Sequence, residues 1–306
     1  MSVEDALGLL QGLRGSVVAG ERLARHTTLQ VGGPAALFIT CDTYGALRQT
    51  DAVLKACGVP WVIMGGGGSV IAADEGYPGA VITLGREFGR LTLGADGTVH
   101  VGAATYLTRV VQEAFTRGLA GVEFLVGIPG TVGGALSTNA TVGDAQLGRL
   151  VDEVVTYRPG HGLVRYAGSE IDWFRRVSSI PSREIILEAT LRLSPGDDAA
   201  VKREMATILA RRGAYQPLRM PACDAIFMDP PDAGGASAAE LVAACGLAGF
   251  SVGRARTFER NPNFIVNAGG ARAADVTNVI ITTLSKVRQR YGIELRPEVK
   301  FLGFPS

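Results

Sequence analysis

The sequence predicts a globular α+β protein built from three packed units, and three observations lead to this prediction. The chain has 306 residues, more than one compact domain usually holds. It is 47% hydrophobic and only 19% charged, a composition that excludes a disordered chain. Segments with strand and helix periodicity alternate along it. A chain of this kind can build a deep binding pocket.

The first unit is predicted to cover residues 1–85 and to alternate strands with a helix. Residues 35–41 and 61–65 are short apolar runs typical of strands. Residues 43–58 have helical spacing and end at a glycine, which favours a helix that stops there. The first unit is therefore a small α/β unit.

The second unit is predicted over residues 86–195. It opens with a hairpin in which Asp96 and Gly97 form the turn, followed by an amphipathic helix that stops at Gly118. Residues 151–160 and 183–196 supply further strands.

The third unit is predicted over residues 196–306. It carries three helices, over residues 201–215, 237–249 and 275–292, and the last of them ends at Gly292. Because clefts between domains are common binding positions, the three-unit arrangement predicts a ligand held between the units.

Several function classes are excluded by charge and composition. Thirty basic and 29 acidic residues give a formal charge of +1, so neither nucleic acid nor a membrane is expected as a partner. No apolar run approaches the roughly 18 residues of a membrane span, and the amino terminus lacks a secretory signal, so a cytoplasmic protein is expected. The cysteines and histidines are too scattered for a metal site or a triad, and we expect three of the four cysteines to be buried: Cys41, Cys57, Cys223, Cys245.

Glycine is the most unusual feature, with 41 residues, or about 13% of 306, against a typical ~7%. Four glycines and a serine form a first glycine loop, Gly65–Ser69, after an apolar strand. Its successive N–H groups could bind phosphate oxygens, although a tight structural turn fits equally well. The spacing matches neither a Walker A loop nor a Rossmann fingerprint.

A second glycine loop spans residues 127–134 and is more specific, because a proline fixes the backbone between glycines. A bend that lets two elements cross closely is the alternative interpretation. One extended dinucleotide bound by both loops explains them better than two unrelated turns. The predicted cofactor-binding residues are Gly65, Gly66, Gly67, Gly68, Ser69, Gly127, Ile128, Pro129, Gly130, Thr131, Gly133 and Gly134.

Six ordered motifs resemble the UDP-N-acetylenolpyruvoylglucosamine reductase (MurB) family. The resemblance implies an FAD-binding fold of the vanillyl-alcohol-oxidase (PCMH) type in the first two units and a substrate-binding third unit. It implies FAD as cofactor, NADPH as reductant, and a small-molecule substrate for a monomer or small homo-oligomer. The motifs lie at residues 25–35, 65–82, 118–136, 216–221, 263–267 and 291–299.

In this family, a reduced flavin gives hydride to an enolpyruvyl double bond and a serine gives the proton. The family arginine matches Arg176, with Arg175 in the position of the family tyrosine, and the family glutamate matches Glu298. A guanidinium near a developing enolate lowers its energy, and a glutamate can act as a general acid. The resemblance also assigns Asn139 to the cofactor and Gln216 and Asn263 to the substrate.

The chain departs from the family where the proton and the nucleotide are handled. Ala225 occupies the serine position, and a methyl group cannot supply a proton that is worth about 10²–10⁴-fold in rate. Cys223 and Asp224 are the nearest substitutes. Met228 and Asp229 stand where the family has lysine and asparagine, which weakens attraction to a diphosphate.

These departures favour a diverged FAD-dependent oxidoreductase that oxidises or reduces a small molecule without a diphosphate in specialised metabolism. Two alternatives stay open at this point. One is the family reductase itself, active in peptidoglycan precursor synthesis with a substituted proton donor. The other is a flavin-binding scaffold without turnover.

Overall fold

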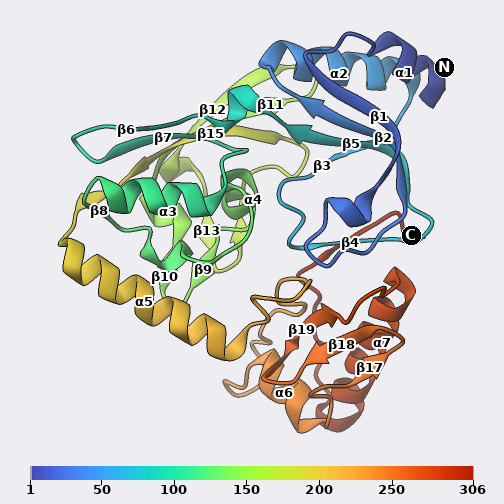
Figure 1. Ribbon diagram of the computed structural model, residues 1–306, viewed down its shortest axis with the longest axis vertical. Coiled ribbons are helices and arrows are strands. Elements are labelled where there is room, and N and C mark those ends of the chain that lie inside the picture. Colours follow the sequence, from blue (N-terminus) through green and yellow to red (C-terminus); the bar gives the residue numbers. More distant parts are fainter. Residues whose placement is uncertain (1, 306) are drawn as a thin grey trace. The chain divides into compact units, whose positions relative to one another are not determined.

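The computed structural model describes residues 2–305 and divides the chain into two compact units, drawn together in Figure 1. Unit 1 holds the chain up to Ala19, Leu37–Gly66 and Gly79–Ala210. Unit 2 holds Gly20–Ala36, Gly67–Pro78 and the chain from Arg211 onward. The chain passes from unit 1 to unit 2 inside the first glycine loop. The separation of two FAD-binding domains at residue 85 stays a prediction.

A five-stranded antiparallel sheet is the centre of unit 1. Its strand order is β12-β11-β15-β7-β6. The predicted hairpin at Gly97 is confirmed, since β6 and β7 pair antiparallel and Gly97 has a φ of 80°. The strands are β6 Leu91–Leu93, β7 Thr98–Gly102, β11 Val151–Arg158, β12 Gly162–Ala167 and β15 Ile185–Arg192.

Both faces of this sheet are buried. Ile186 joins the core that contains helices α3 (Leu107–Thr116) and α4 (Val132–Ser137), and these helices lie along the sheet in Figure 1. Its neighbours Ile185 and Leu187 point to the opposite face and join a second core. The sheet thereby fixes the start of α4, where the second glycine loop ends.

A four-stranded sheet of order β1-β2-β5-β3 carries the strand that precedes the first glycine loop. Helix α2 packs against it through Leu47 and Leu54, begins at an N-cap Thr43 and ends at a left-handed Gly58, as the sequence predicts. Helix α1 and strand β1 are absent from the sequence prediction. The elements are α1 Val3–Leu9, β1 Gly15–Arg22, β2 Pro34–Cys41, α2 Tyr44–Cys57, β3 Trp61–Ile63 and β5 Tyr77–Leu84.

Unit 2 is built on a three-stranded antiparallel sheet of order β17-β18-β19. Helices α6 and α7 pack on it around Ile265 and Val279, and α7 ends at a left-handed Gly292, as predicted. A parallel pair, β4 with β20, also belongs to this unit. The elements are β4 Val70–Ala72, α6 Ala238–Ala244, β17 Ser251–Val252, β18 Ala255–Phe258, β19 Asn261–Asn267, α7 Ala273–Tyr291 and β20 Lys300–Leu302.

Helix α5 (Asp198–Tyr215) runs from the end of unit 1 into unit 2 and buries only Val201. Its charged face is mostly solvated, as predicted. Six two-residue strands complete unit 1: β8 Leu119–Ala120, β9 Thr141–Val142, β10 Ala145–Gln146, β13 Trp173–Phe174, β14 Val177–Ser178 and β16 Ser194–Pro195.

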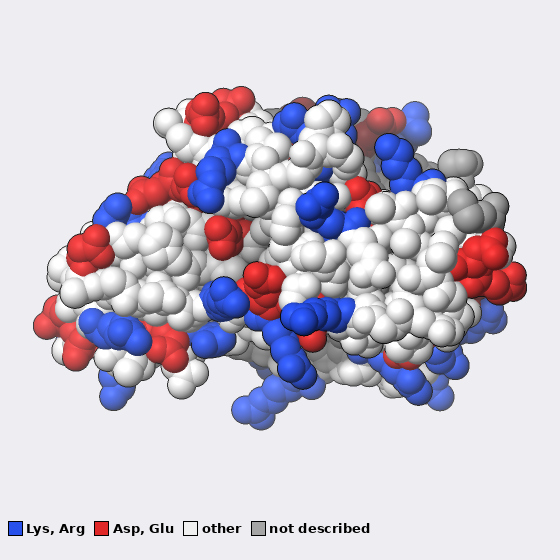
Figure 2. Space-filling model, turned by 90° about the horizontal axis from the view of Figure 1, so that it is seen from above, with Lys and Arg blue, Asp and Glu red and all other residues white. Residues whose placement is uncertain are grey.

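Surface charge, helix length and the grouping of metal-binding side chains bear on the function class. Basic and acidic side chains are interspersed over the face shown in Figure 2, where no broad field of one sign forms. Among residues 2–305, every helix is too short or too polar to cross a bilayer. The same residues contain no group of three or more His, Cys, Asp or Glu side chains placed to hold a metal.

Candidate functional site

The first glycine loop offers unused backbone donors. Within the described chain, the N–H groups of Gly65–Ser69 donate to no protein acceptor. Gly67 has a φ of 67°, in the left-handed region that favours glycine. Successive N–H groups of this kind form a nest that binds anions.

The two glycine loops touch each other within unit 1. A Cβ atom on Gly65 would lie 2.6 Å from Thr131 Oγ1, and one on Gly66 would lie 2.8 Å from Gly130 Cα. Only glycine permits this approach. The close crossing offered as the alternative interpretation is observed, and it brings the two loops side by side. Cofactor binding by these residues stays a prediction.

The second glycine loop is held by its backbone. Gly127 and Gly130 have φ values of 73° and 125°. Val132 N–H donates to Thr105 O and Gly133 N–H donates to Ala103 O, each at 2.9 Å. This loop is a rigid turn, as predicted. An elongated phosphate-containing cofactor such as FAD fits the paired loops, because bare backbone lets its oxygens approach the N–H groups.

Asn139, predicted to bind the cofactor, ties unit 1 together instead of leaving its amide open. It is fully buried with a φ of 42°. Its Nδ2 donates to Gln146 Oε1 at 2.9 Å and to Phe174 O at 2.8 Å, and its Oδ1 accepts from Gly148 N–H at 2.9 Å. Both amide protons are thus used by the protein.

The bond from Asn139 to Phe174 anchors the hairpin that presents the predicted catalytic arginine. Strands β13 and β14 pair antiparallel, with Arg175 and Arg176 as the two turn residues. Arg176 has a φ of 63°, an unusual conformation for a non-glycine residue. Arg175 Nη1 donates to Gly143 O at 2.9 Å. The hairpin is therefore anchored at the two residues that directly precede Arg176.

The second half of the first glycine loop contacts Asp224 and Cys223 within unit 2. Gly68 O accepts from Asp224 N–H at 3.0 Å and from Cys223 Sγ–H at 3.2 Å. Ser69 Oγ donates to Asp224 Oδ2 at 2.9 Å. The segment that carries the missing serine is thereby joined to a predicted cofactor loop.

The segment around Ile226, the clamped segment, is hydrogen-bonded on both sides to other parts of the chain. Ile226 N–H donates to Asn263 O at 2.8 Å, and Glu298 N–H donates to Ile226 O at 2.7 Å. The Asn263 amide exchanges two bonds with the Phe227 backbone, at 2.8 and 2.9 Å. Asn263, predicted to bind substrate, therefore positions the segment. The backbone of Glu298 holds the same segment from the other side.

The thiol of Cys223 is a poor proton source. Burial raises its pKa, and the nearby carboxylates of Asp224 and Glu298 raise it further. Arg212 is a neighbour that the sequence analysis missed. Burial lowers the pKa of its guanidinium while the charge of Asp224 raises it. Its place on a helix face predicted to be solvated gave no signal of this role.

The remaining predicted substrate residues lie around this segment. Met228 is half-buried, and its N–H donates to Arg296 O at 3.0 Å. Asp229 is exposed, and its Oδ1 accepts from Ala238 N–H at 2.9 Å, at the start of α6. Gln216 follows the last turn of α5. The carboxylate of Asp229 therefore has a structural partner of its own.

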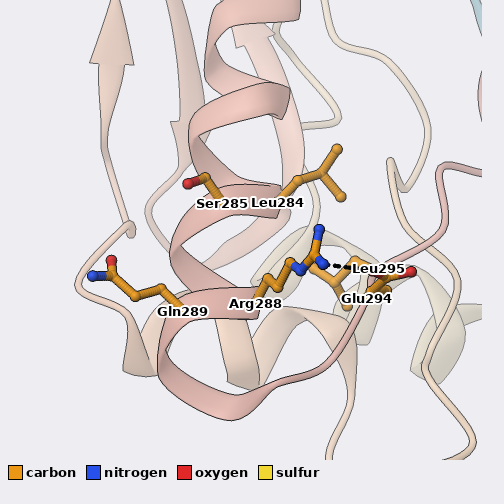
Figure 3. Close-up of a pocket in the computed structure, with 6 residues that line it drawn as sticks. All are labelled: Leu284, Ser285, Arg288, Gln289, Glu294 and Leu295. Atoms are coloured by element: carbon orange, nitrogen blue, oxygen red, sulfur yellow. Dashed lines mark ion pairs between the residues drawn. The ribbon is translucent and has the colours of Figure 1, made fainter.

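A cavity of about 790 Å³ lies elsewhere in unit 2, beside the end of α7. Figure 3 shows Arg288 and Glu294 paired across it at 3.5 Å. None of the predicted site residues lines it, so it belongs to no part of the site described above. Its lining residues are Leu284, Ser285, Arg288, Gln289, Glu294 and Leu295.

Comparison with protein families matches two segments of the chain. Residues 35–158 match the FAD binding domain, and residues 216–302 match the C-terminal domain of UDP-N-acetylenolpyruvoylglucosamine reductase. The first segment contains both contacting glycine loops of unit 1. The second contains the clamped segment with Asp224 and Ala225.

Similarity to individual proteins extends over nearly the whole chain. UDP-N-acetylenolpyruvoylglucosamine reductase of Syntrophotalea carbinolica is 36% identical, covering 95% of this chain and 96% of its own. That of Geobacter metallireducens is 38% identical, covering 95% of each. The crystal structure of the enzyme from Thermus caldophilus matches with a TM-score of 0.79 at 33% identity, covering 94% of this chain and 99% of its own. The predicted fold class is confirmed.

Proposed function

The chain belongs to the UDP-N-acetylenolpyruvoylglucosamine reductase family, and we propose that it reduces the enolpyruvyl group of that UDP-sugar as an FAD-dependent enzyme with NADPH as reductant. The observation that carries the proposal is that similarity to reductases of this name covers both the flavin-binding and the C-terminal segments. This ranks the family reaction above the role in specialised metabolism that the substitutions favour.

Each part of the chain has a role in this proposal. FAD held by the paired glycine loops would supply the hydride for the double bond. The loops bind its phosphates through backbone N–H groups. Arg176 stabilises the negative charge that develops on the substrate, and its anchored hairpin keeps the guanidinium in place. Glu298 assists from the chain that pairs with the clamped segment of unit 2.

A direct experiment measures absorbance of the FAD-loaded protein without oxygen. NADPH should bleach the flavin, and the UDP-enolpyruvyl sugar should then restore its colour. A flavin that NADPH bleaches but the UDP-sugar leaves bleached would refute the proposed substrate. A protein that takes up no flavin would favour the scaffold.

An altered substrate is a second candidate function, and specific residues favour it. Ala225 has no proton to give, and Met228 has no charge for a diphosphate. Oxidation or reduction of a small molecule without a diphosphate would suit both. The same absorbance measurement tests this candidate. UDP should not slow the return of flavin colour by a substrate that lacks a diphosphate.

The cellular setting follows from the same proposal. The partner is a small molecule, the location is cytoplasmic, and the enzyme works as a monomer or small homo-oligomer. Size measurement in solution tests the last point.

A further inference from the structure

We propose that Asp224 replaces the missing family serine as the residue that gives the proton, with Ser69 as its positioning residue. This inference rests on the proposed function. It starts from the bond that Ser69 Oγ donates to Asp224 Oδ2 at 2.9 Å, between residues 155 positions apart. Asp224 directly precedes Ala225, and its own N–H is bonded to Gly68 O.

Gly68 and Asp224 lie against each other in unit 2. A Cβ on Gly68 would lie 2.9 Å from Asp224 Oδ2. A side chain at position 68 would therefore meet the carboxylate in its present place. The absence of a side chain on Gly68 leaves room for that of Asp224.

The neighbouring thiol is the weaker candidate on geometry. Cys223 is only 2% exposed, and its Sγ–H points at Gly68 O. Burial raises its pKa. Asp224 is half-buried and keeps one carboxyl oxygen, Oδ1, for which no hydrogen-bond partner is found among residues 2–305.

The neighbours of Asp224 come from three parts of unit 2. Arg212 of α5 interacts with it electrostatically. Ser69, on the loop, is its neutral hydrogen-bond donor. The adjacent Cys223 thiol interacts with the carboxylates of both Asp224 and Glu298.

Once hydride has bonded to the methylene carbon, the electron pair of the double bond rests on the adjacent carbon. The Asp224 O–H bond breaks and its proton bonds to this carbon. The resulting carboxylate recovers a proton from water, while Ser69 keeps the carboxylate oriented.

The kinetic experiment uses FAD-loaded protein reduced by NADPH and mixed with the UDP-enolpyruvyl sugar. Asp224→Asn should slow the return of flavin colour by about 10²–10⁴-fold, with flavin reduction by NADPH unchanged. Adding Ala225→Ser to Asp224→Asn should raise the rate of colour return at least about tenfold, because the family donor is restored. Asp232→Asn, an exposed carboxylate of the same unit, is the matched control.

A second measurement needs no substrate. Gly68→Ser should lower the melting temperature by about 2–4 °C in the natural chain but have little effect in Asp224→Gly protein, since the two positions touch. Equal effects in both backgrounds would refute the coupling. Natural protein that never restores flavin colour with the UDP-sugar would overturn the proposed function. Restoration at the natural rate by Asp224→Asn would overturn this inference alone.

Discussion

The two halves of the first glycine loop use different chemistry. Gly65 and Gly66 lie against Gly130 and Thr131 of the second loop and present bare backbone. Gly68 and the following serine lie against a carboxylate and act through a side chain. A site made of backbone needs only that side chains be absent, whereas a site made of side chains depends on which groups they carry.

The largest expected effect on cofactor binding comes from adding a side chain where the two glycine loops touch. Gly66→Ala puts a Cβ 2.8 Å from Gly130 Cα and forces the loops apart. We expect FAD binding to weaken about tenfold to a hundredfold, because overpacking costs about 1–3 kcal/mol and 1.4 kcal/mol is a factor of ten. Titration of flavin fluorescence measures this. Gly45→Ala in α2, with 3.8 Å to Thr43 Oγ1, is the control, and equal affinities in the two variants would contradict the prediction.

Two of the buried asparagines, Asn139 in unit 1 and Asn263 in unit 2, should have a large effect on stability. Asn139→Ala removes three hydrogen bonds and leaves alanine at a φ of 42°. Asn263→Ala removes two. We expect unfolding free energies to fall by about 2–4 kcal/mol, more for Asn139, because buried partners lose their bonds. Urea unfolding measures both, and exposed Asn278→Ala should change little. If either variant unfolded at the same urea concentration as the natural chain, the positioning role of that asparagine would be refuted.

A smaller effect is expected at Asp229, beside the start of α6. Asp229→Asn keeps an oxygen that can accept from Ala238 N–H, so the start of α6 should persist. Removing one negative charge should tighten UDP binding about fivefold, since charges about 4 Å apart in water interact by about 1 kcal/mol. Calorimetric titration of UDP tests this, with Asp232→Asn alongside. Unchanged affinity would mean that UDP does not approach Asp229.

The smallest expected signal concerns the thiols. Burial raises the pKa of Cys41 to about 11 and also raises that of Cys223. The reactive thiolate of each is therefore scarce at pH 8 and grows only as pH rises toward these higher values. Half-buried Cys245 should account for nearly all labelling of the native chain by a thiol reagent. Fast labelling that survives Cys245→Ala would contradict this and would reopen Cys223 as a proton donor.

Much of the fold could be predicted because its signals are local. Helix α2 follows from apolar spacing between Thr43 and Gly58, and the β6–β7 hairpin follows from its Asp-Gly turn. The expectation of three buried cysteines is confirmed. Strand β1 escaped prediction because its residues are mostly exposed and show no apolar period.

The sequence by itself determined where glycine is required, which segments are strands and helices, and which family the motifs indicate, because backbone conformation and periodicity are set by neighbouring residues. Only the tertiary structure decided what the polar side chains do. Asn139 and Asn263 hold backbone, Asp229 accepts from a helix, and Asp224 meets Ser69 across 155 positions. A hydrogen bond depends on distance in space, and long-range pairing is invisible along a single chain.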